Sequence, residues 1–172
     1  APRSITTVAL STTLATNAVV EGKGAAVGLL MIGPTTATHF ELPAAQVAYI
    51  RGGHKWSGEE EDPLDLEVLA ATLEEWRGQV DAHAACAALS VRNPTRELAA
   101  AKAASLIDPR PFFCSHQASG EYGMKERAST AVLNASLMPL MERFLDGVDR
   151  SLGALEPGGQ PRLVCGDAGV ID

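Results

Sequence analysis

The sequence alternates short apolar runs with segments of helical period, and this alternation limits the folds open to the chain more than any other feature. Apolar runs bounded by turn residues predict strands at 6–10, 26–32, 46–51, 80–89, 111–115 and 162–165. Between them, the spacing of apolar residues predicts helices at 11–21, 66–77, 94–106 and 125–152. Strands that alternate with helices are typical of an α/β fold, in which helices flank a parallel or mixed sheet.

Both ends of this pattern are open, because nothing precedes the first strand and the chain stops soon after the last one. We therefore expect residues 1–172 to be one α/β piece of a longer protein, with sub-lobes at 1–115 and 116–172. The net charge of −7, with 14 basic residues dispersed among 21 acidic ones, argues against a nucleic-acid partner. The most apolar segment, 25–32, is too short to span a bilayer, and no secretory signal opens the sequence, so a cytoplasmic protein is expected.

Several local features are predicted from single residues. Asp65 is expected to cap helix 66–77, and Pro139 is expected to bend the long helix, because proline removes a backbone hydrogen bond. The Gly- and acid-rich stretch 52–62 is expected to be a solvated loop, and His83, in a predicted strand, a structural residue. Three widely spaced cysteines are expected to be reduced, buried small side chains: Cys86, Cys114 and Cys165.

Two turns that each follow a predicted strand are the candidate ligand sites. Where a strand leads into a helix, backbone N–H groups and the positive end of the helix dipole face outward and can bind a phosphate or carboxylate. The candidates are Ser11, Thr12, Thr13 and Asn17 at the first turn, and Gly166, Asp167 and Gly169 at the second. The alternatives are that Ser11 only caps its helix and that 166–169 is an ordinary turn.

The long helix carries a stripe that changes from apolar to polar towards its N-terminal end. Arg127, Thr130 and Asn134 form the polar part. Such a helix either extends from the core into a cleft, or its polar side chains satisfy buried backbone groups. His54 and His116 are further cleft candidates, because an imidazole can move protons near neutral pH. No paired metal-ligand motif is present, so no metal site is predicted in the protein itself.

Several segments, in the order in which they occur, resemble motifs of the hydantoinase/oxoprolinase family. Residues 12–25 are similar to its T-T-x-A-T-N-A-x-x-E-x-x-G-A segment, and 52–65 to its G-G-H…G…P-L-D stretch. Residues 90–97 resemble S-x-R-N-P-x-x-E, and 115–135 resemble S-H-E followed by R-x-x-T-x-x-x-N-A. The resemblance spans nearly the whole chain.

The resemblance implies an actin-like, ribonuclease H-like ATPase fold, in which two lobes clasp a nucleotide. It implies ATP and Mg²⁺ as cofactors, and ATP-driven opening of a cyclic amide, a hydantoin or 5-oxoproline, by the full-length protein. The partners that it allows are a second hydantoinase subunit and a further copy of the same chain. Residues 12–13 and 166–169 would lie near phosphates or substrate, while Arg127, Thr130 and Asn134 would line the cleft.

The sequence departs from the family pattern at two positions. Ala168 stands where the family's Gly-Asp-Gly motif has its second glycine, and alanine is costly if the backbone there needs a positive φ. Gln117 follows His116 in place of a glutamate. The first departure keeps open a catalytically inactive nucleotide-binding or interaction subunit. A sugar-kinase-like phosphotransferase is a third alternative on the same general fold.

Overall fold

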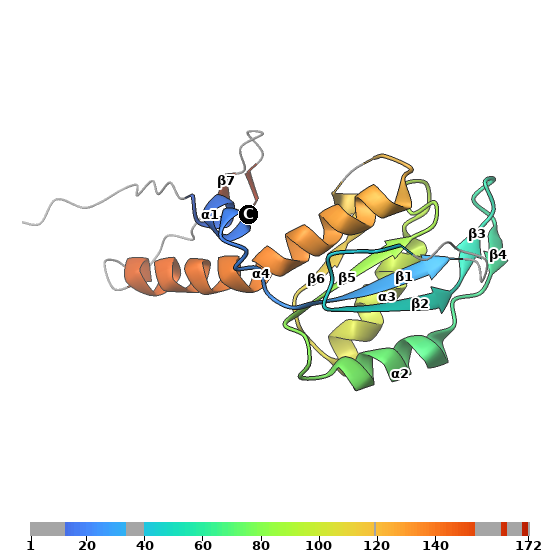
Figure 1. Ribbon diagram of the computed structural model, residues 1–172, viewed down its shortest axis with the longest axis horizontal. Helices are drawn as coiled ribbons and strands as arrows, with labels where there is room; N and C mark the ends of the chain where they lie inside the picture. Colours follow the sequence, from blue (N-terminus) through green and yellow to red (C-terminus); the bar gives the residue numbers. More distant parts are fainter. Residues whose placement is uncertain (1–12, 34–39, 119, 154–162, 165–169, 172) are drawn as a thin grey trace, which may run out of the picture.

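The computed structural model describes residues 13–33, 40–118, 120–153, 163–164 and 170–171, and its main sheet has four parallel strands (Figure 1). Their order across the sheet is β2 (Gln46–Arg51), β1 (Val27–Gly33), β5 (Ala82–Ala87) and β6 (Phe112–Cys114). In the centre, Leu30 of β1 lies opposite both Ala48 of β2 and Ala85 of β5. The four strands therefore end at one edge, and the predicted parallel sheet is confirmed.

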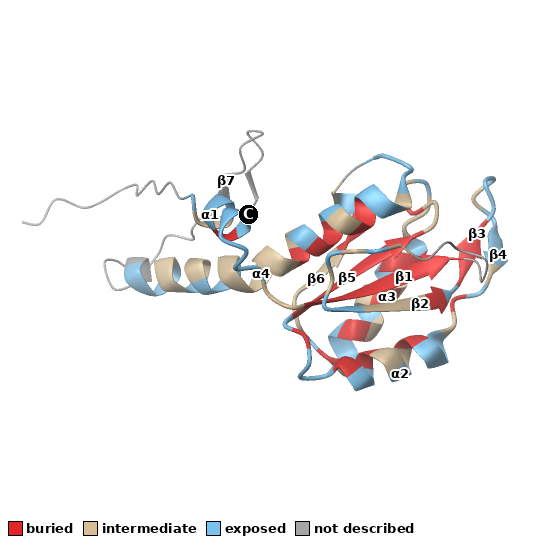
Figure 2. Ribbon diagram, viewed as in Figure 1, coloured by how far each residue is buried: buried red, intermediate tan, exposed pale blue. Residues whose placement is uncertain are grey.

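The strands bury both of their faces, because successive side chains of a strand point to opposite sides of the sheet. Leu30 packs on one face with α2 (Leu66–Trp76) and α3 (Thr95–Ile107). Leu29 packs on the other face with α4 (Met124–Gly153). Figure 2 shows β1 and β5 buried along their lengths. Cover on both faces explains why these two strands are apolar runs with little polar alternation.

The long helix α4 crosses the sheet and then continues beyond it. Its sheet-facing residues are small, and Ala128, Ala131 and Ala135 are fully buried against β1 and β5. Figure 1 shows the helix changing direction about halfway along, as predicted from Pro139, which lies inside it. Near this bend the carbonyl of Ser136 accepts a hydrogen bond of 2.9 Å from the backbone N–H of Ala25, which ties the helix to the segment before β1.

Residues 52–62 form an antiparallel hairpin, so the predicted loop is wrong, whereas the predicted solvent exposure of the acidic residues is confirmed for 59–61. Its strands are β3 (Gly53–His54) and β4 (Glu60–Asp62). The hairpin is held by Arg96 of α3, which contacts the Glu60 carboxylate and donates to the carbonyl of Asp62 at 2.9 Å. A contact made across more than thirty residues leaves no local signal, which is why the acidic composition indicated a loop.

The helix starts were predicted closely. Asp65 caps α2 by accepting a hydrogen bond of 3.1 Å from the N–H of Val68, which confirms the predicted cap. Pro94 occupies the N-cap position of α3, not the first helical position as expected. The first helix, α1 (Leu14–Val20), is shorter than predicted. The predicted strand 6–10 lies outside the described residues, and Cys165 does too.

Within the last predicted strand, 162–165, the described residues form β7 (Leu163–Val164), which pairs antiparallel with β8 (Val170–Ile171). The buried, unpaired state predicted for the cysteines is confirmed for Cys86 and Cys114. His83 is buried within β5, where its Nε2 lies 3.0 Å from Asp108, as expected for a structural residue. Within the described residues no helix has the length and apolarity that crossing a bilayer requires.

Candidate functional site

A cluster of buried polar side chains lies where β5 and β6 end. Ser90 follows β5, Ser115 and His116 follow β6 in a short 3₁₀ helix (Ser115–Gln117), and Glu97 and Arg127 come from the first turns of α3 and α4. Ligands of open α/β sheets bind outside the carboxyl ends of the strands. This edge of the sheet is therefore the expected position of a ligand-binding or active site. We call these five residues the Glu97 cluster.

The carboxylate of Glu97 is the centre of the cluster and accepts four hydrogen bonds. Its Oε1 accepts from the N–H of Ala87 at 2.8 Å and from the Ser115 hydroxyl at 2.6 Å. Its Oε2 accepts from the backbone N–H of His116 at 3.0 Å and lies 2.6 Å from His116 Nδ1. Glu97 is fully buried, so these donors take the place of water around its charge.

Arg127 supplies the positive charge of the cluster. Its guanidinium donates to the hydroxyls of Ser90 at 2.5 Å and Ser115 at 2.8 Å, and to the carbonyl of Ala87 at 3.1 Å. The guanidinium lies 3.9 Å from the Glu97 carboxylate, and both side chains are almost fully buried. The Ser115 hydroxyl accepts from the cation and donates to the anion, so it links the two charges.

The electrostatics fix the ionisation of the buried groups. Burial raises the pKa of the Glu97 carboxyl, but the hydrogen bonds from Ser115, Ala87 and His116 outweigh it and hold the pKa below its ordinary value. Burial and the neighbouring Glu97 charge raise the pKa of the Cys114 thiol to about 12. Burial likewise raises the pKa of the Cys86 thiol. Glu97 is thus an anion at neutral pH, and neither thiol is a ready nucleophile.

The backbone beside the cluster has an uncommon conformation. Leu89, between Ala87 and Ser90, has a φ of 57°, which non-glycine residues seldom adopt. Its carbonyl accepts hydrogen bonds from the N–H groups of Arg92 at 2.9 Å and Asn93 at 3.1 Å. This turn directs the Ser90 hydroxyl back towards Arg127, and unfavourable backbone conformations of this kind concentrate at functional sites.

Among the described residues, Glu97, Cys114 and His116 could hold a metal ion, since one ligand atom of each lies within 4.8 Å of the others. The geometry fits such an ion poorly. Both carboxylate oxygens already accept two hydrogen bonds each, and the thiol has a raised pKa. The set also does not suit Mg²⁺, which prefers oxygen ligands. The cluster is therefore better suited to moving a proton than to binding a metal.

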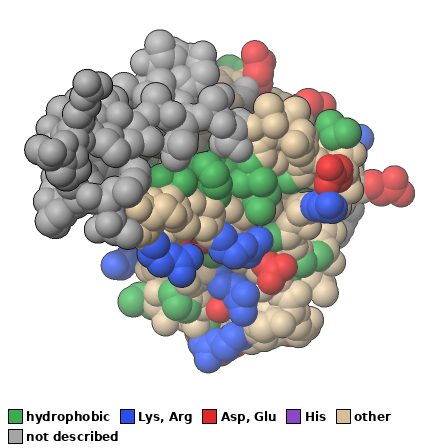
Figure 3. Space-filling model, turned by 90° about the vertical axis from the view of Figure 1, so that its left-hand side faces the viewer, with side chains coloured by type: hydrophobic (Ala, Val, Ile, Leu, Met, Phe, Trp, Pro, Cys, Tyr) green, Lys and Arg blue, Asp and Glu red, His purple; other side chains and the backbone are tan. Residues whose placement is uncertain are grey.

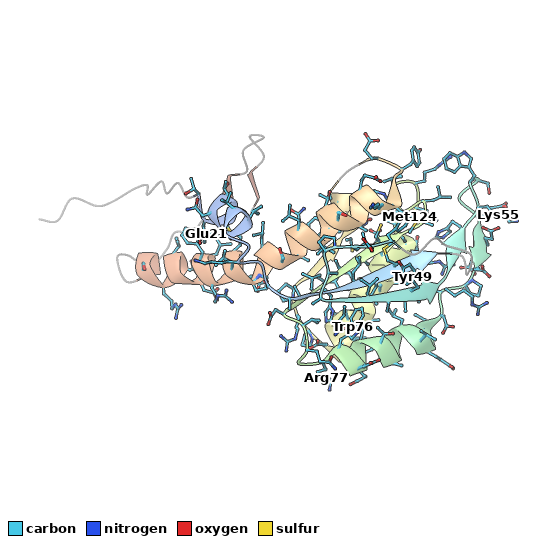
Figure 4. The ribbon with its side chains drawn as sticks, viewed as in Figure 1. Glu21, Tyr49, Lys55, Trp76, Arg77 and Met124 are labelled. Atoms are coloured by element: carbon cyan, nitrogen blue, oxygen red, sulfur yellow. The ribbon has the colours of Figure 1, made fainter. Side chains whose placement is uncertain are left out.

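An exposed aromatic pair lies at the same edge of the sheet. The rings of Trp56, from the β3–β4 turn, and Tyr122, which precedes α4, have centroids 5.3 Å apart, and the Arg92 guanidinium lies 5.6 Å from the Trp56 ring. Both aromatic side chains are more than half exposed. Figure 4 labels Lys55, the neighbour of Trp56, and Met124 on the side towards which the strands point. This edge of the sheet thus also carries an exposed aromatic surface.

The structure brings together only two of the predicted cleft residues, His116 and Arg127. Thr130 and Asn134 bond within their own helix, to the carbonyls of Glu126 at 2.9 Å and of Thr130 at 2.8 Å. His54 is buried in β3, and burial followed by the nearby Arg96 charge lowers the pKa of its imidazole. The charged residues that act on His54 are Arg96 and Glu60, and neither belongs to the Glu97 cluster.

The predicted phosphate-binding residues are only partly described. Thr13 occupies the N-cap position of α1 without a side-chain capping bond, and its hydroxyl lies 3.3 Å from the donating Asn17 amide. Both are exposed, and Figure 1 shows α1 beside α4 on the side opposite the carboxyl ends of the strands. Five of the predicted residues lie outside the described residues: Ser11, Thr12, Gly166, Asp167 and Gly169.

Ser90, Glu97 and Ser115 lie within the family-like motifs, but they were not among the predicted site residues. One signal could have identified Glu97. It shares a helix face with Ala100 and Ala104, at spacings of three and seven residues, and both alanines are fully buried. A glutamate on the alanine face of a helix must be buried and therefore needs partners.

A separate hollow of about 310 Å³ lies near the bend of α4, lined among others by Lys23, Asp81, Arg110 and Arg143. Figure 3 views the molecule from this side and shows Lys and Arg side chains gathered there. Most of these charges are already compensated, because Arg110 lies 3.3 Å from Asp108 and Lys23 lies 2.6 Å from Glu21. The hollow is therefore a weaker candidate than the Glu97 cluster.

The structure defines an α/β chain with a buried polar cluster at the carboxyl edge of its parallel sheet, and comparison with known proteins identifies its family. The model of the hydantoinase/oxoprolinase N-terminal region matches residues 1–107, so the chain belongs to the hydantoinase/oxoprolinase family. The predicted family is confirmed.

Caprolactamase subunit alpha of Pseudomonas jessenii is 30% identical over 176 residues, which covers 85% of this chain and 25% of that protein. The crystal structure of ATP-dependent caprolactamase from the same organism superposes with a TM-score of 0.68 at 30% identity, over 87% of this chain and 25% of that one. The nucleotide-free structure of acetone carboxylase is similar in fold, with a TM-score of 0.69 at 14% identity over 92% of this chain and 27% of that one. The chain thus spans about a quarter of the relatives' length, and its fold is consistent with the predicted actin-like ATPase class.

Proposed function

We propose that this chain is part of an ATP-dependent hydrolase that opens a small cyclic amide of the hydantoin or 5-oxoproline type. The observation that carries the proposal is the 30% identity with caprolactamase subunit alpha across 85% of the chain. That relative's name places a lactam as its substrate, and the related structure is described as ATP-dependent. The relative is named as a subunit, which supports the proposal that the full-length protein assembles with a second subunit.

The start of α1 bears on where ATP would bind. Thr13 stands at the N-cap of α1, and its side chain makes no capping hydrogen bond. Exposed Thr13 and Asn17 lie on the side opposite the carboxyl ends of the strands, so they would not hold the phosphoryl group that is transferred to an amide at that edge. ATP would supply a phosphoryl group that makes the amide carbon more electrophilic.

The Glu97 cluster would serve the amide rather than the nucleotide. It lies at the carboxyl edge of the sheet, away from α1, and combines a fixed anion with an accessible imidazole. Opening an amide ring requires a proton on the departing nitrogen, because an amide anion is a poor leaving group. His116 and Arg127 are the predicted cleft residues whose geometry best fits this task, whereas Thr130 and Asn134 would only border the cleft.

The test uses the full-length protein with ATP and a panel of 5-oxoproline, hydantoin and caprolactam. We expect release of inorganic phosphate that depends on one of these compounds, together with equimolar ring-opened product measured by mass spectrometry. Binding of ATP without turnover would favour the inactive subunit instead. Transfer of the phosphoryl group onto a stable product would favour the phosphotransferase.

A further inference from the structure

Glu97 and His116 form a pair whose arrangement goes beyond holding the fold together. His116 Nδ1 lies 2.6 Å from Glu97 Oε2, and the backbone N–H of His116 donates to the same oxygen at 3.0 Å. The Glu97 side chain is fully buried, whereas the His116 side chain is 20% exposed. A buried carboxylate thus holds one nitrogen of a partly exposed imidazole ring.

The contact with Glu97 determines which ring nitrogen carries the proton in the neutral imidazole. An ionised carboxylate can only accept, so Nδ1 must donate, and the lone pair is left on Nε2. The ring contact that the structure shows between His116 and Glu97 is made through Nδ1, so Nε2 is the nitrogen left to meet a substrate or water. An imidazole held in this way by a carboxylate is the arrangement in which histidine acts as a general base in Ser-His-Asp enzymes.

The carboxylate itself cannot turn, because its other oxygen is held from two sides. Oε1 accepts from the Ala87 N–H and from the Ser115 hydroxyl, and Ser115 is in turn held by Arg127. These bonds keep the pKa of Glu97 low despite its burial, so it stays an anion while the imidazole changes its protonation. A fixed anion also stabilises the imidazolium that forms when Nε2 takes a proton.

We propose that His116 is the catalytic base and acid of ring opening, with Glu97 as its positioning residue. This inference rests on the function proposed above and names the residue that handles the proton.

In the step that we assign to it, Nε2 takes a proton from a water molecule as the water oxygen bonds to the amide carbon, whose oxygen would carry the phosphoryl group from ATP. The imidazolium then returns that proton to the ring nitrogen as the carbon–nitrogen bond breaks, which leaves an amine and an acyl phosphate in one open chain. A second water molecule converts the acyl phosphate into a carboxylic acid and inorganic phosphate, and His116 ends neutral, as it began. The exposed Trp56 and Tyr122 rings at the same edge supply an apolar surface against which a small ring can pack.

The experiment compares the full-length protein with His116→Ala, Glu97→Gln and a control, Lys125→Ala. Lys125 is exposed in the first turn of α4 and makes no contact with the cluster. Lactam-dependent turnover is measured from acid to neutral pH, with and without added imidazole. The charged and titratable groups around His116 are Glu97 from α3, Arg127 from α4 and Cys114 from β6, so the profile of each variant is compared with the wild type.

We expect His116→Ala to lower kcat/KM by a factor on the order of 10²–10⁴, the usual contribution of general acid–base catalysis, with KM little changed. The wild type should lose activity towards acid pH, this loss should be absent from His116→Ala, and added imidazole should restore part of the rate of that variant. Glu97→Gln should move the acid-side limb, and Lys125→Ala should match the wild type.

Two outcomes would overturn the inference while leaving the proposed function standing. One is a wild type that opens a lactam and a His116→Ala variant within about threefold of it. The other is a loss of activity that imidazole does not restore and that leaves the pH profile unchanged, because that result indicates a structural role. No turnover of any lactam by the wild type would instead remove the proposed function, and this inference with it.

Discussion

Replacing Arg127 by methionine should destabilise the chain more than any surface change, because it leaves the buried Glu97 charge without its countercharge. Arg127 is 1% exposed and donates to Ser90, Ser115 and the carbonyl of Ala87. Methionine keeps much of the packing but none of these hydrogen bonds. Removing one partner of a buried ion pair costs about 3–5 kcal/mol. We expect the free energy of unfolding to fall by that amount.

A double-mutant cycle separates the interaction of the charges from the loss of packing. Glu97→Gln alone leaves a buried cation, so it is also costly, but the combined variant buries neither charge. Its cost should be smaller than the sum of the single costs by about 1–3 kcal/mol. The exposed pair Glu74 and Arg77, with 3.1 Å between its charged atoms, is the matched control. Its coupling should be about 0.2–1 kcal/mol.

Urea unfolding of the 172-residue chain at neutral pH, followed by circular dichroism, measures both quantities. A cost below about 1 kcal/mol for Arg127→Met, at an unchanged dependence on urea, would refute the reasoning. A Glu97–Arg127 coupling no larger than that of the surface pair would refute it equally.

Two further predictions concern the core. Gly28→Ala should cost about 1–3 kcal/mol in the same assay, because the new Cβ would lie 2.5 Å from Trp76, whereas Gly147→Ala, with nothing within 4 Å, should not destabilise. Burial outweighs the hydrogen bond to Asp108 and lowers the pKa of His83 below its ordinary value of 6.5, so the unfolded chain binds a proton more readily than the folded one. Stability should therefore decline as pH falls below 6.5, down to the lower pKa of the folded state, and His83→Gln should weaken that decline in urea titrations at several pH values.

The sequence predicted the elements of this fold well, because their signals are local. Neighbouring residues alone produce the apolar runs of β1 and β5 and the helical spacing of α2. The N-cap of α2 was likewise predictable, because Asp65 lies directly before the helix and aspartate is favoured at that position. The candidate site was only partly predictable. Arg127 and His116 were predicted correctly as residues of the site. Thr130 lies on the same predicted stripe as Arg127, but its hydroxyl donates to the Glu126 carbonyl of its own helix.

What the chain alone determined is therefore its class and family: an α/β piece with hydantoinase/oxoprolinase motifs in order. Only the tertiary structure decided which polar residues meet. Glu97 reaches His116 across nineteen positions and Arg127 reaches Ala87 across forty, and no periodicity encodes such contacts. They form because a parallel sheet brings the ends of separate strands together at one edge. Buried charges there are shielded from water, so each must be paired with a group from another part of the chain.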